Sequence, residues 1–469
     1  MSNAKEAVEG RVQVERLRVV ELSGAFGIGG TEQAVEIRSA LLDRTRFDVR
    51  AVGVFGGPRR TRLAEHGVEV TDLAGDLGRL GPLLDEFSPH VLHYTRSERD
   101  CVHSKIVQAE ALRAQVPVLI ETNVFGRPAG WEQRRAPNLT CHMSLASMLR
   151  CARTAGRSMP ELYGEGHRAV YLPVPTPEAY GAASPSREAA RQALGVAPDE
   201  ILACRVARPD LRKWSTRLEL ALPALFAQHP TLRLAFMAAP AEKVRHLRAR
   251  FGRRVLCLEP DSSFERLAAI YSASDFMLHS SGIGESFGSS MAEAMFHGLP
   301  VVVDSTPELD NAQVEVVQNE RTGLIVRSSA GFVAAALRLS QNPAERAELG
   351  RGARERAATW FADRVVTRAW ESNYAAASAT AGIALSPALA AACEGGPKPF
   401  GPEDYAAFGA RYEAACRDTF GPDPDWRELG VGQLVRAWDT LQYARQRGMG
   451  PLVRVLKSRL RAGRLLSRE

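Results

Sequence analysis

Short apolar runs recur through the first third of the chain, with polar stretches of helical periodicity between them. The runs lie at residues 17–22, 49–55, 68–73, 91–94, 116–120 and 169–172. Helical patterns follow Gly30 and cover residues 104–114. Apolar strands that alternate with helices are typical of a parallel sheet with crossover helices. The pattern predicts a Rossmann-like α/β domain over residues 1–178.

A second series of strands follows a proline-rich stretch. Residues 172–177 read Leu-Pro-Val-Pro-Thr-Pro, and the Gly, Ala and Ser residues after them predict a linker. We then expect buried strands at 201–207, 232–237, 255–258, 276–278, 299–303 and 324–326. The predicted fold class is α/β, with two doubly wound Rossmann-like domains facing a cleft. The second domain is expected to cover residues 179–360.

The last hundred residues have a different composition. Trp360 and a helical stretch over 361–375 are expected to close the second domain, and the Ala-, Gly- and Pro-rich residues 376–402 predict a linker. Residues 403–469 predict a helical extension that ends in Arg and Lys side chains among leucines and valines. Two interpretations of this basic end remain open. It could lie on an anionic membrane surface, or pack on the other domains or on a partner.

Composition excludes several classes of protein. Of the 469 residues, 45% are hydrophobic and 24% are charged, as in an ordinary soluble chain. No apolar run approaches the ~20 residues of a membrane span, and residues 1–10 have no apolar core that would predict a signal peptide. The seven cysteines are scattered without a C-x-x-C pair, which predicts neither a disulfide framework nor a zinc site. We therefore expect a cytoplasmic protein, and one of the two interpretations of its basic end makes it peripheral on the inner membrane face.

Residues 285–293 carry the most specific chemistry. A carboxylate, Glu285, lies in a loop after a buried strand, and a second, Glu293, falls eight positions later inside a predicted helix. Gly288 allows a turn, and Ser289 and Ser290 are candidate N-caps. A helix start binds phosphate readily, and carboxylates suit the hydroxyls of a sugar or ribose. The segment predicts a sugar-nucleotide site, although a solvated loop and a surface helix would also explain one such pair of acids.

Two further loops follow strands in the expected order. After the strand at 201–207, Arg208 and Lys213 place two cations where they could stabilise a departing diphosphate. Arg205 and Arg212 are weaker candidates in the same run. Gly29 and Gly30 end a glycine-rich turn after the first strand, and Thr31 is expected to cap the next helix. Position 32 is Glu, so the dinucleotide-binding fingerprint is not met.

Together these residues resemble a known family. Glu285 and Glu293 match the E-x7-E pattern, and Arg208 and Lys213 the Arg-x4-Lys spacing, of retaining glycosyltransferases of the GT-B fold and the family 4, or glycosyltransferase group 1, type. The resemblance covers roughly residues 15–375. It implies that Glu285 contacts the donor sugar, that Glu293 holds the ribose, and that a terminal helix returns to the first domain.

The resemblance implies further donor contacts. Backbone amides around Phe287, Gly288 and Ser289 would hold the diphosphate, which Gly29 and Gly30 would approach from the first domain. Many family members place a histidine facing the sugar at the position of Asn123. Asn can hydrogen-bond a hydroxyl but does not take up a proton, so this departure puts a protein general base in doubt. His93, at a strand end, is a second-choice site residue, although such a histidine is more often structural.

The implied activity is transfer of a sugar from a nucleoside diphosphate sugar to an acceptor hydroxyl with retention of configuration, by front-face attack. The acceptor is expected to be a glycan, a lipid-linked molecule or a small molecule, with no nucleic-acid partner. No metal and no further cofactor are expected. Two alternatives remain: a hydrolase with paired carboxylates, which has no use for Arg208 and Lys213, and a non-catalytic sugar-nucleotide binder or scaffold of the same fold.

Overall fold

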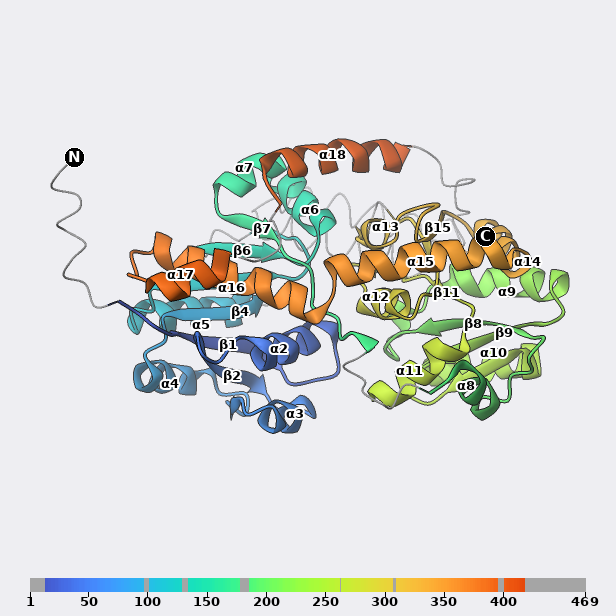
Figure 1. Ribbon diagram of the computed structural model, residues 1–469, viewed down its shortest axis with the longest axis horizontal. Helices are drawn as coiled ribbons and strands as arrows, with labels where there is room; N and C mark the ends of the chain where they lie inside the picture. The colour runs from blue at the N-terminus through green and yellow to red at the C-terminus, as the bar shows by residue number, and fades with distance from the viewer. Residues whose placement is uncertain are drawn as a thin grey trace, which may run out of the picture.

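The computed structural model describes residues 13–96, 101–128, 134–177, 185–261, 263–306, 309–394 and 400–417. Two separate parallel sheets dominate it, each covered by helices (Figure 1). The first sheet has seven strands in the order β3-β2-β1-β4-β5-β6-β7. Its strands are β1 (Leu17–Ala25), β2 (Phe47–Phe55), β3 (Glu69–Asp72), β4 (Val91–Arg96), β5 (Val118–Asn123), β6 (Leu139–His142) and β7 (His167–Ala169).

Helices form most of the crossover connections between these strands, since two parallel neighbours cannot be joined by a tight turn. They are α2 (Gly30–Leu41), α3 (Arg59–Glu65), α4 (Leu80–Phe87), α5 (Cys101–Arg113), α6 (Leu145–Ala155) and α7 (Met159–Gly164), with a short 3-10 turn at Leu77–Arg79. Local sequence fixes several of their starts. Ser144 and Ser158 each form a capping box, with Ser147 and Glu161 respectively. All six residues of β5 are buried, as expected for a central strand covered on both faces.

The second sheet has six strands in the order β10-β9-β8-β11-β13-β15. They are β8 (Ile201–Val206), β9 (Leu232–Met237), β10 (Val255–Leu258), β11 (Phe276–His279), β13 (Val301–Asp304) and β15 (Gly323–Val326). The associated helices are α8 (Arg187–Ala193), α9 (Thr216–Gln228), α10 (Ala241–Phe251), α11 (Phe264–Ala273), α12 (Ser289–Phe296), α13 (Gln313–Val316) and α14 (Ser329–Gln341), with 3-10 turns at Leu211–Lys213 (η3) and Gly252–Arg254. Two short strands, β12 (Gly284–Glu285) and β14 (Asp310–Asn311), pair beside this sheet.

Two long helices join the domains (Figure 1). α15 (Pro343–Trp360) lies on the second domain, and α16 (Asp363–Thr380) packs on α2 of the first. Tyr374 of α16 contacts two strands of the first sheet: its hydroxyl donates to Glu21 of β1 and lies 2.7 Å from His93 Nδ1 of β4. α17 (Pro387–Glu394) follows, and α18 (Pro402–Arg417) packs on α7 and α6.

Both predicted sheets are confirmed, and with them the two-domain α/β fold class. The six strands expected in the second domain are present, but the first domain has a seventh, β6, that the sequence pattern did not reveal. Residues 376–402, expected to be a linker, contain the end of α16 and the whole of α17. Alanine-rich sequence favours helix once a face can be buried, and Leu389 is buried here.

The expected C-terminal extension is helical where it is described, over Pro402–Arg417. The basic end at 418–469 lies outside the described residues. Across the described ranges, the helices lack the combination of length and apolar character that crossing a bilayer requires.

Candidate active site

The loop after β11 leads directly into the N-terminus of α12. Gly288 is the N-cap and has φ +98°, a backbone conformation that only glycine adopts without strain. The helix begins at Ser289, so Ser289 and Ser290 are its first residues and not its caps as the sequence suggested. Glycine has no side chain that could accept a hydrogen bond, so the first amides of α12 do not donate to a cap side chain. That arrangement suits an anion.

Glu285 lies at the centre of a buried charge network. Lys213 Nζ is 2.8 Å from its Oε2 and 3.3 Å from the carbonyl oxygen of Gly284. His279 Nε2 is 3.2 Å from Oε1. Burial on its own would raise the pKa of Glu285, but Lys213 and the His279 hydrogen bond outweigh it and hold the pKa well below the ordinary range. Glu285 is consequently a carboxylate at neutral pH.

A second layer holds this network in place. Arg205, almost fully buried, donates to the carbonyl oxygens of Lys213 at 2.8 Å and Ser280 at 2.9 Å. Its other terminal nitrogen lies 3.3 Å from His279 Nδ1. Burial, and then Arg205, lower the pKa of His279 to about 4. The imidazole is therefore neutral, and Arg205 holds the backbone of the loop.

The other two cations of this loop point outward. Arg208 is exposed, and its carbonyl oxygen accepts from the Trp214 indole at 2.8 Å, which fixes the loop. Arg212 pairs with Asp210 at 2.9 Å on the surface. Lys213 is thus the cation that forms an ion pair with Glu285. Arg208, five residues earlier in the chain, is exposed.

Glu293 is buried inside α12, eight positions after Glu285. Its Oε2 accepts from the Tyr271 hydroxyl at 2.8 Å. Burial raises the pKa of Glu293, and the Tyr271 bond and the charge of Arg59 offset only part of that rise. Arg59 belongs to α3 of the first domain, so the two domains approach each other at this acid.

Helix starts from both domains meet at this site. A Cβ built on Gly30 would lie 2.8 Å from the Ser289 hydroxyl, so the first turn of α2 is directly beside the first turn of α12. Gly29 is the N-cap of α2, again without a side-chain hydrogen bond. The expected capping role of Thr31 is therefore wrong, because the helix already begins at Gly30. Glycine at 30 permits the close approach of the two domains.

Two predicted donor-binding residues, Phe287 and Asn123, use their side chains for contacts within the protein. Phe287 is buried against Tyr171 and Phe361, with ring centroids 5.9 and 5.3 Å away. A donor contact at Phe287 would therefore come from its backbone. The Asn123 amide donates to the Arg127 carbonyl oxygen at 2.6 Å and accepts from the Arg127 amide at 3.2 Å, which holds its own loop.

His93, the second-choice residue, is enclosed in the first domain. Its ring bonds to Tyr374 and, at 2.7 Å, to the Thr122 hydroxyl. Burial, and then Arg38, lower the pKa of His93 to about 4. The position makes His93 part of the contact between α16 and the first sheet.

Local sequence patterns did not reveal the residues that organise the acids. His279 lies on β11 and Tyr271 on α11, while Arg59 comes from α3 of the first domain, and no local pattern connects them to Glu285 or Glu293. Gln313 is also new: its Oε1 accepts from the Glu285 amide at 3.2 Å, and its Nε2 donates to the Asp304 carbonyl oxygen at 3.0 Å. Only His279 gave a signal, as a polar residue at the end of an apolar strand.

Comparisons with known proteins agree with this fold. Residues 202–342, which run from β8 to the end of α14, match the family model described as glycosyl transferases group 1. Comparison with curated protein sequences gives no significant match. Among solved structures, HepE of Anabaena in complex with UDP aligns with a TM-score of 0.60 at 18% identity, over 76% of this chain and 98% of that one.

Two other enzymes share the fold. A glycosyltransferase from Rickettsia africae has a TM-score of 0.63 at 12% identity, covering 78% of this chain and 99% of that one. Sucrose-phosphate synthase from Thermosynechococcus elongatus has a TM-score of 0.56 at 18% identity, covering 77% and 100%. The chain thus has the fold of these GT-B glycosyltransferases, and residues 202–342 of its second domain match the group 1 glycosyl transferase model. The resemblance found in the sequence is confirmed at this level.

Proposed function

We propose that the protein is a retaining glycosyltransferase, which moves a sugar from a nucleoside diphosphate sugar to an acceptor hydroxyl. The observation that carries the proposal is the Lys213–Glu285 pair, at 2.8 Å, in the loop that leads into the N-terminus of α12. One charge of the pair suits a phosphate and the other suits sugar hydroxyls. A nucleoside diphosphate sugar presents both groups side by side.

The site concentrates positive potential where a diphosphate would leave. The first turns of α2 and α12 meet at Gly30 and Ser289, and each helix start carries a partial positive charge. Lys213 and the accessible Arg208 add two full charges. Because negative charge on the diphosphate grows during bond breaking, these groups stabilise the transition state more than the bound donor. In this proposal they take the place of a metal ion.

Glu285 is poorly suited to be a proton donor, because Lys213 and His279 keep it ionised. We assign it to the donor sugar, where a carboxylate accepts hydroxyl hydrogen bonds and stabilises positive charge near the anomeric carbon. Glu293, held by Tyr271, would accept from the ribose hydroxyls. In the proposed front-face step the anomeric carbon–phosphate oxygen bond breaks while the acceptor oxygen bonds on the same face. The acceptor proton passes to the departing phosphate oxygen.

The base and sugar of the donor are open to direct testing. HepE of Anabaena has been crystallised with UDP and with UDP-glucose, which makes uridine diphosphate sugars the first donors to try. A thermal-shift panel of nucleoside diphosphate sugars would identify the donor. Turnover would then be followed as release of nucleoside diphosphate, with and without candidate acceptors, and the product anomer assigned by NMR.

A matched pair of variants tests the roles of the acids. Glu285→Gln is expected to keep donor binding but to lose transfer by a factor of about a hundred or more, whereas Glu259→Gln, on an exposed loop, should retain full activity. A product of inverted configuration would refute the retaining mechanism. Donor binding without turnover on any donor or acceptor would instead support the scaffold alternative.

The proposal extends to membrane contact by the basic end of the chain. A peripheral role of the basic residues 418–469 on an anionic membrane stays part of the proposal. α18 packs on α6 and α7, so truncation should begin after Arg417 and leave that helix intact. Loss of vesicle sedimentation with unchanged donor turnover would support the role, and unchanged sedimentation would refute it.

A further inference from the structure

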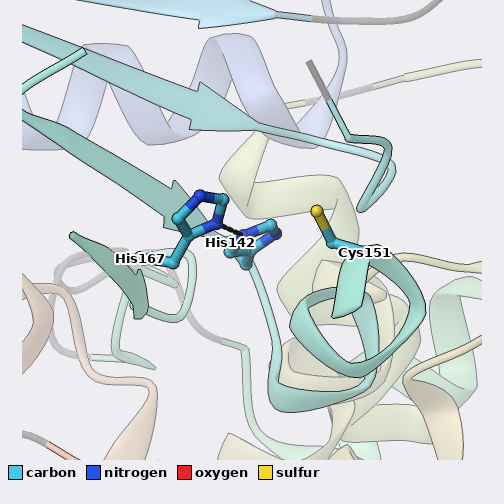
Figure 2. Close-up of side chains that lie close together, drawn as sticks. All are labelled: His142, Cys151 and His167. Atoms are coloured by element: carbon cyan, nitrogen blue, oxygen red, sulfur yellow. Dashed lines mark hydrogen bonds between the residues drawn. The ribbon is translucent and has the colours of Figure 1, made fainter. Parts of the chain in front are cut away.

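Three ligand-type side chains gather at the far edge of the first sheet, where β6 and β7 meet α6. They are His142, Cys151 and His167, and the nearest N and S atoms that they offer all lie within 4.8 Å of one another. Figure 2 shows His142 between the other two, with its hydrogen bond to His167 dashed. None of the three belongs to the candidate active site.

The fold brings the histidines together through strand register. β6 and β7 are parallel, with Thr140 opposite His167 and His142 opposite Ala169. Residues two apart on a strand share a face, so both imidazoles project on the same side of the sheet. Their Nε2 and Nδ1 atoms are 2.9 Å apart. α6 starts three residues after β6 and places the buried Cys151 over that face.

One atom of this cluster is left without a partner. His142 is fully buried, and its Nδ1 makes no hydrogen bond with the described residues. A buried polar atom without a hydrogen bond destabilises the fold unless a ligand or water satisfies it. Figure 2 places the ring nitrogen remote from His167 on the side that faces the sulfur of Cys151.

We propose that His142, Cys151 and His167 form a binding site for a metal ion of borderline softness, zinc being the ion that this donor set fits. Two imidazoles and a thiolate are standard zinc ligands, and three protein ligands leave one position of a tetrahedral ion open. Around zinc, neighbouring N and S donors are about 3.3–3.6 Å apart, as the usual bond lengths require. In this structure the ligand atoms lie within 4.8 Å of one another, about 1 Å more than zinc requires. Rotation of the Cys151 and His167 side chains can close that difference.

Metal binding changes the protonation of one member of the cluster. Burial raises the pKa of the Cys151 thiol to about 12. Metal binding must therefore break the S–H bond and release that proton to solvent as the sulfur–metal bond forms. Glu121 and Glu165 act electrostatically on Cys151 and His167, while the charge of Arg96 acts on all three members of the cluster.

Cobalt substitution tests the site directly. Full-length protein freed of metal with a chelator would be titrated with Co²⁺. We expect one equivalent to bind with sulfur-to-cobalt charge-transfer absorption and tetrahedral d–d bands, and Zn²⁺ to displace it. Wild-type protein that shows no sulfur-to-cobalt absorption would overturn the proposal, whatever the variants do.

Two cysteine variants supply the matched comparison. Cys151→Ser should lose the charge-transfer absorption and any rise in Tm on adding Zn²⁺. Cys204→Ser should keep both, because Cys204 is an equally buried free cysteine in β8 of the other domain. Far-ultraviolet circular dichroism would verify that each variant is folded. Charge-transfer absorption that survives in folded Cys151→Ser, or disappears only in Cys204→Ser, would place the metal elsewhere.

Discussion

Glu285 and Glu293 are both buried acids, yet their surroundings shift their pKa values in opposite directions. Glu285 has Lys213 and His279 within 3.2 Å and is held as a carboxylate. Glu293 has one hydroxyl partner, Tyr271, and burial raises its pKa. The two acids are therefore not an acid–base pair with interchangeable roles. The environment assigns the permanent charge to Glu285.

Replacing Lys213 by methionine tests this assignment. Lys213→Met keeps an unbranched apolar stem but removes the charge that Glu285 and the proposed diphosphate share. We expect kcat/KM to fall by about a hundredfold or more. Because burial would then raise the pKa of Glu285, the acid limb of the pH–rate profile should also move to higher pH.

The neighbouring Arg212 provides the control for that experiment. It lies in the same loop and pairs with Asp210 on the surface, so Arg212→Met should leave both the rate and the pH profile close to wild type. An Arg212 effect as large as that of Lys213 would mean that general loop charge, and not the pair with Glu285, supports activity.

Gly288 is the residue on which the start of α12 depends. Its φ of +98° disfavours any side chain, and a Cβ there would meet Met291 Cε at 2.2 Å. We expect Gly288→Ala to lower the free energy of unfolding by about 1–3 kcal/mol and to weaken donor binding. Gly24→Ala is the control, since a Cβ at that position meets nothing within 4 Å. Equal destabilisation in urea unfolding would contradict this account.

Residue types alone indicated part of the site. Two acids eight apart around a glycine, and a lysine after a strand, were visible in the sequence. Their surroundings were not, since the Tyr271 hydroxyl on α11 reaches Glu293, and the charge of Arg59 on α3 acts on it, only because of tertiary packing. The sequence also gave no sign that Phe287 fills an aromatic core and Asn123 holds its own loop. Those outcomes depend on which neighbours surround each side chain.

At the scale of elements, α6 depends on the other domain. The amides of Leu145 and Ala146, in its first turn, each donate at 2.9 Å to a carboxylate oxygen of Glu315, which lies in α13. Ser144 accepts from the third amide. α13 follows β14, which pairs with the strand that carries Glu285. A single short segment therefore joins the donor loop to a helix of the first domain.

Removing the Glu315 carboxylate should loosen that connection. Glu315→Ala would leave two buried amides of α6 without their acceptor, at a cost of about 2–4 kcal/mol. We expect a lower midpoint in urea unfolding and faster proteolysis between the domains. Glu355→Ala removes an exposed glutamate from α15 and should change neither. Unaltered stability of Glu315→Ala would show that water replaces the carboxylate.

Elements were predicted well where apolar runs were long, and poorly where they were short. β6 has the sequence Leu-Thr-Cys-His, whose two polar residues hide a strand buried at all four positions. Hydrogen bonding to β5 and β7 maintains it, and that pairing is not local. α17 was missed for a related reason, because its alanines resemble linker sequence until a packing surface is present.

For the whole molecule, buried neutral histidines link stability to pH. His93 and His279 each have a pKa lowered from 6.5 to about 4. Between these values the unfolded chain binds more protons than the folded one, so stability falls as pH falls. A full shift of this size corresponds to roughly 3 kcal/mol per histidine. We expect the free energy of unfolding to decrease steadily from pH 6.5 to 4.5.

His93→Gln should remove one histidine's share of that slope. Arg38, Glu21, Tyr374 and Thr122 surround His93, and the two acids nearest the histidines, Glu21 and Glu285, have pKa values below this window. His66→Gln, at an exposed position, should preserve the wild-type slope. Urea unfolding at several pH values provides the measurement, and an unchanged slope in His93→Gln would contradict the assignment.

The contact of Tyr374 with Glu21 and His93 has a consequence for how the protein is made. Glu21 is synthesised more than three hundred residues before the tyrosine whose hydroxyl completes its hydrogen bonds. Domains generally fold in order as the chain leaves the ribosome, but the polar core of this first domain can close only after the second domain has been translated. A nascent or truncated first domain therefore exposes the face that α16 later covers.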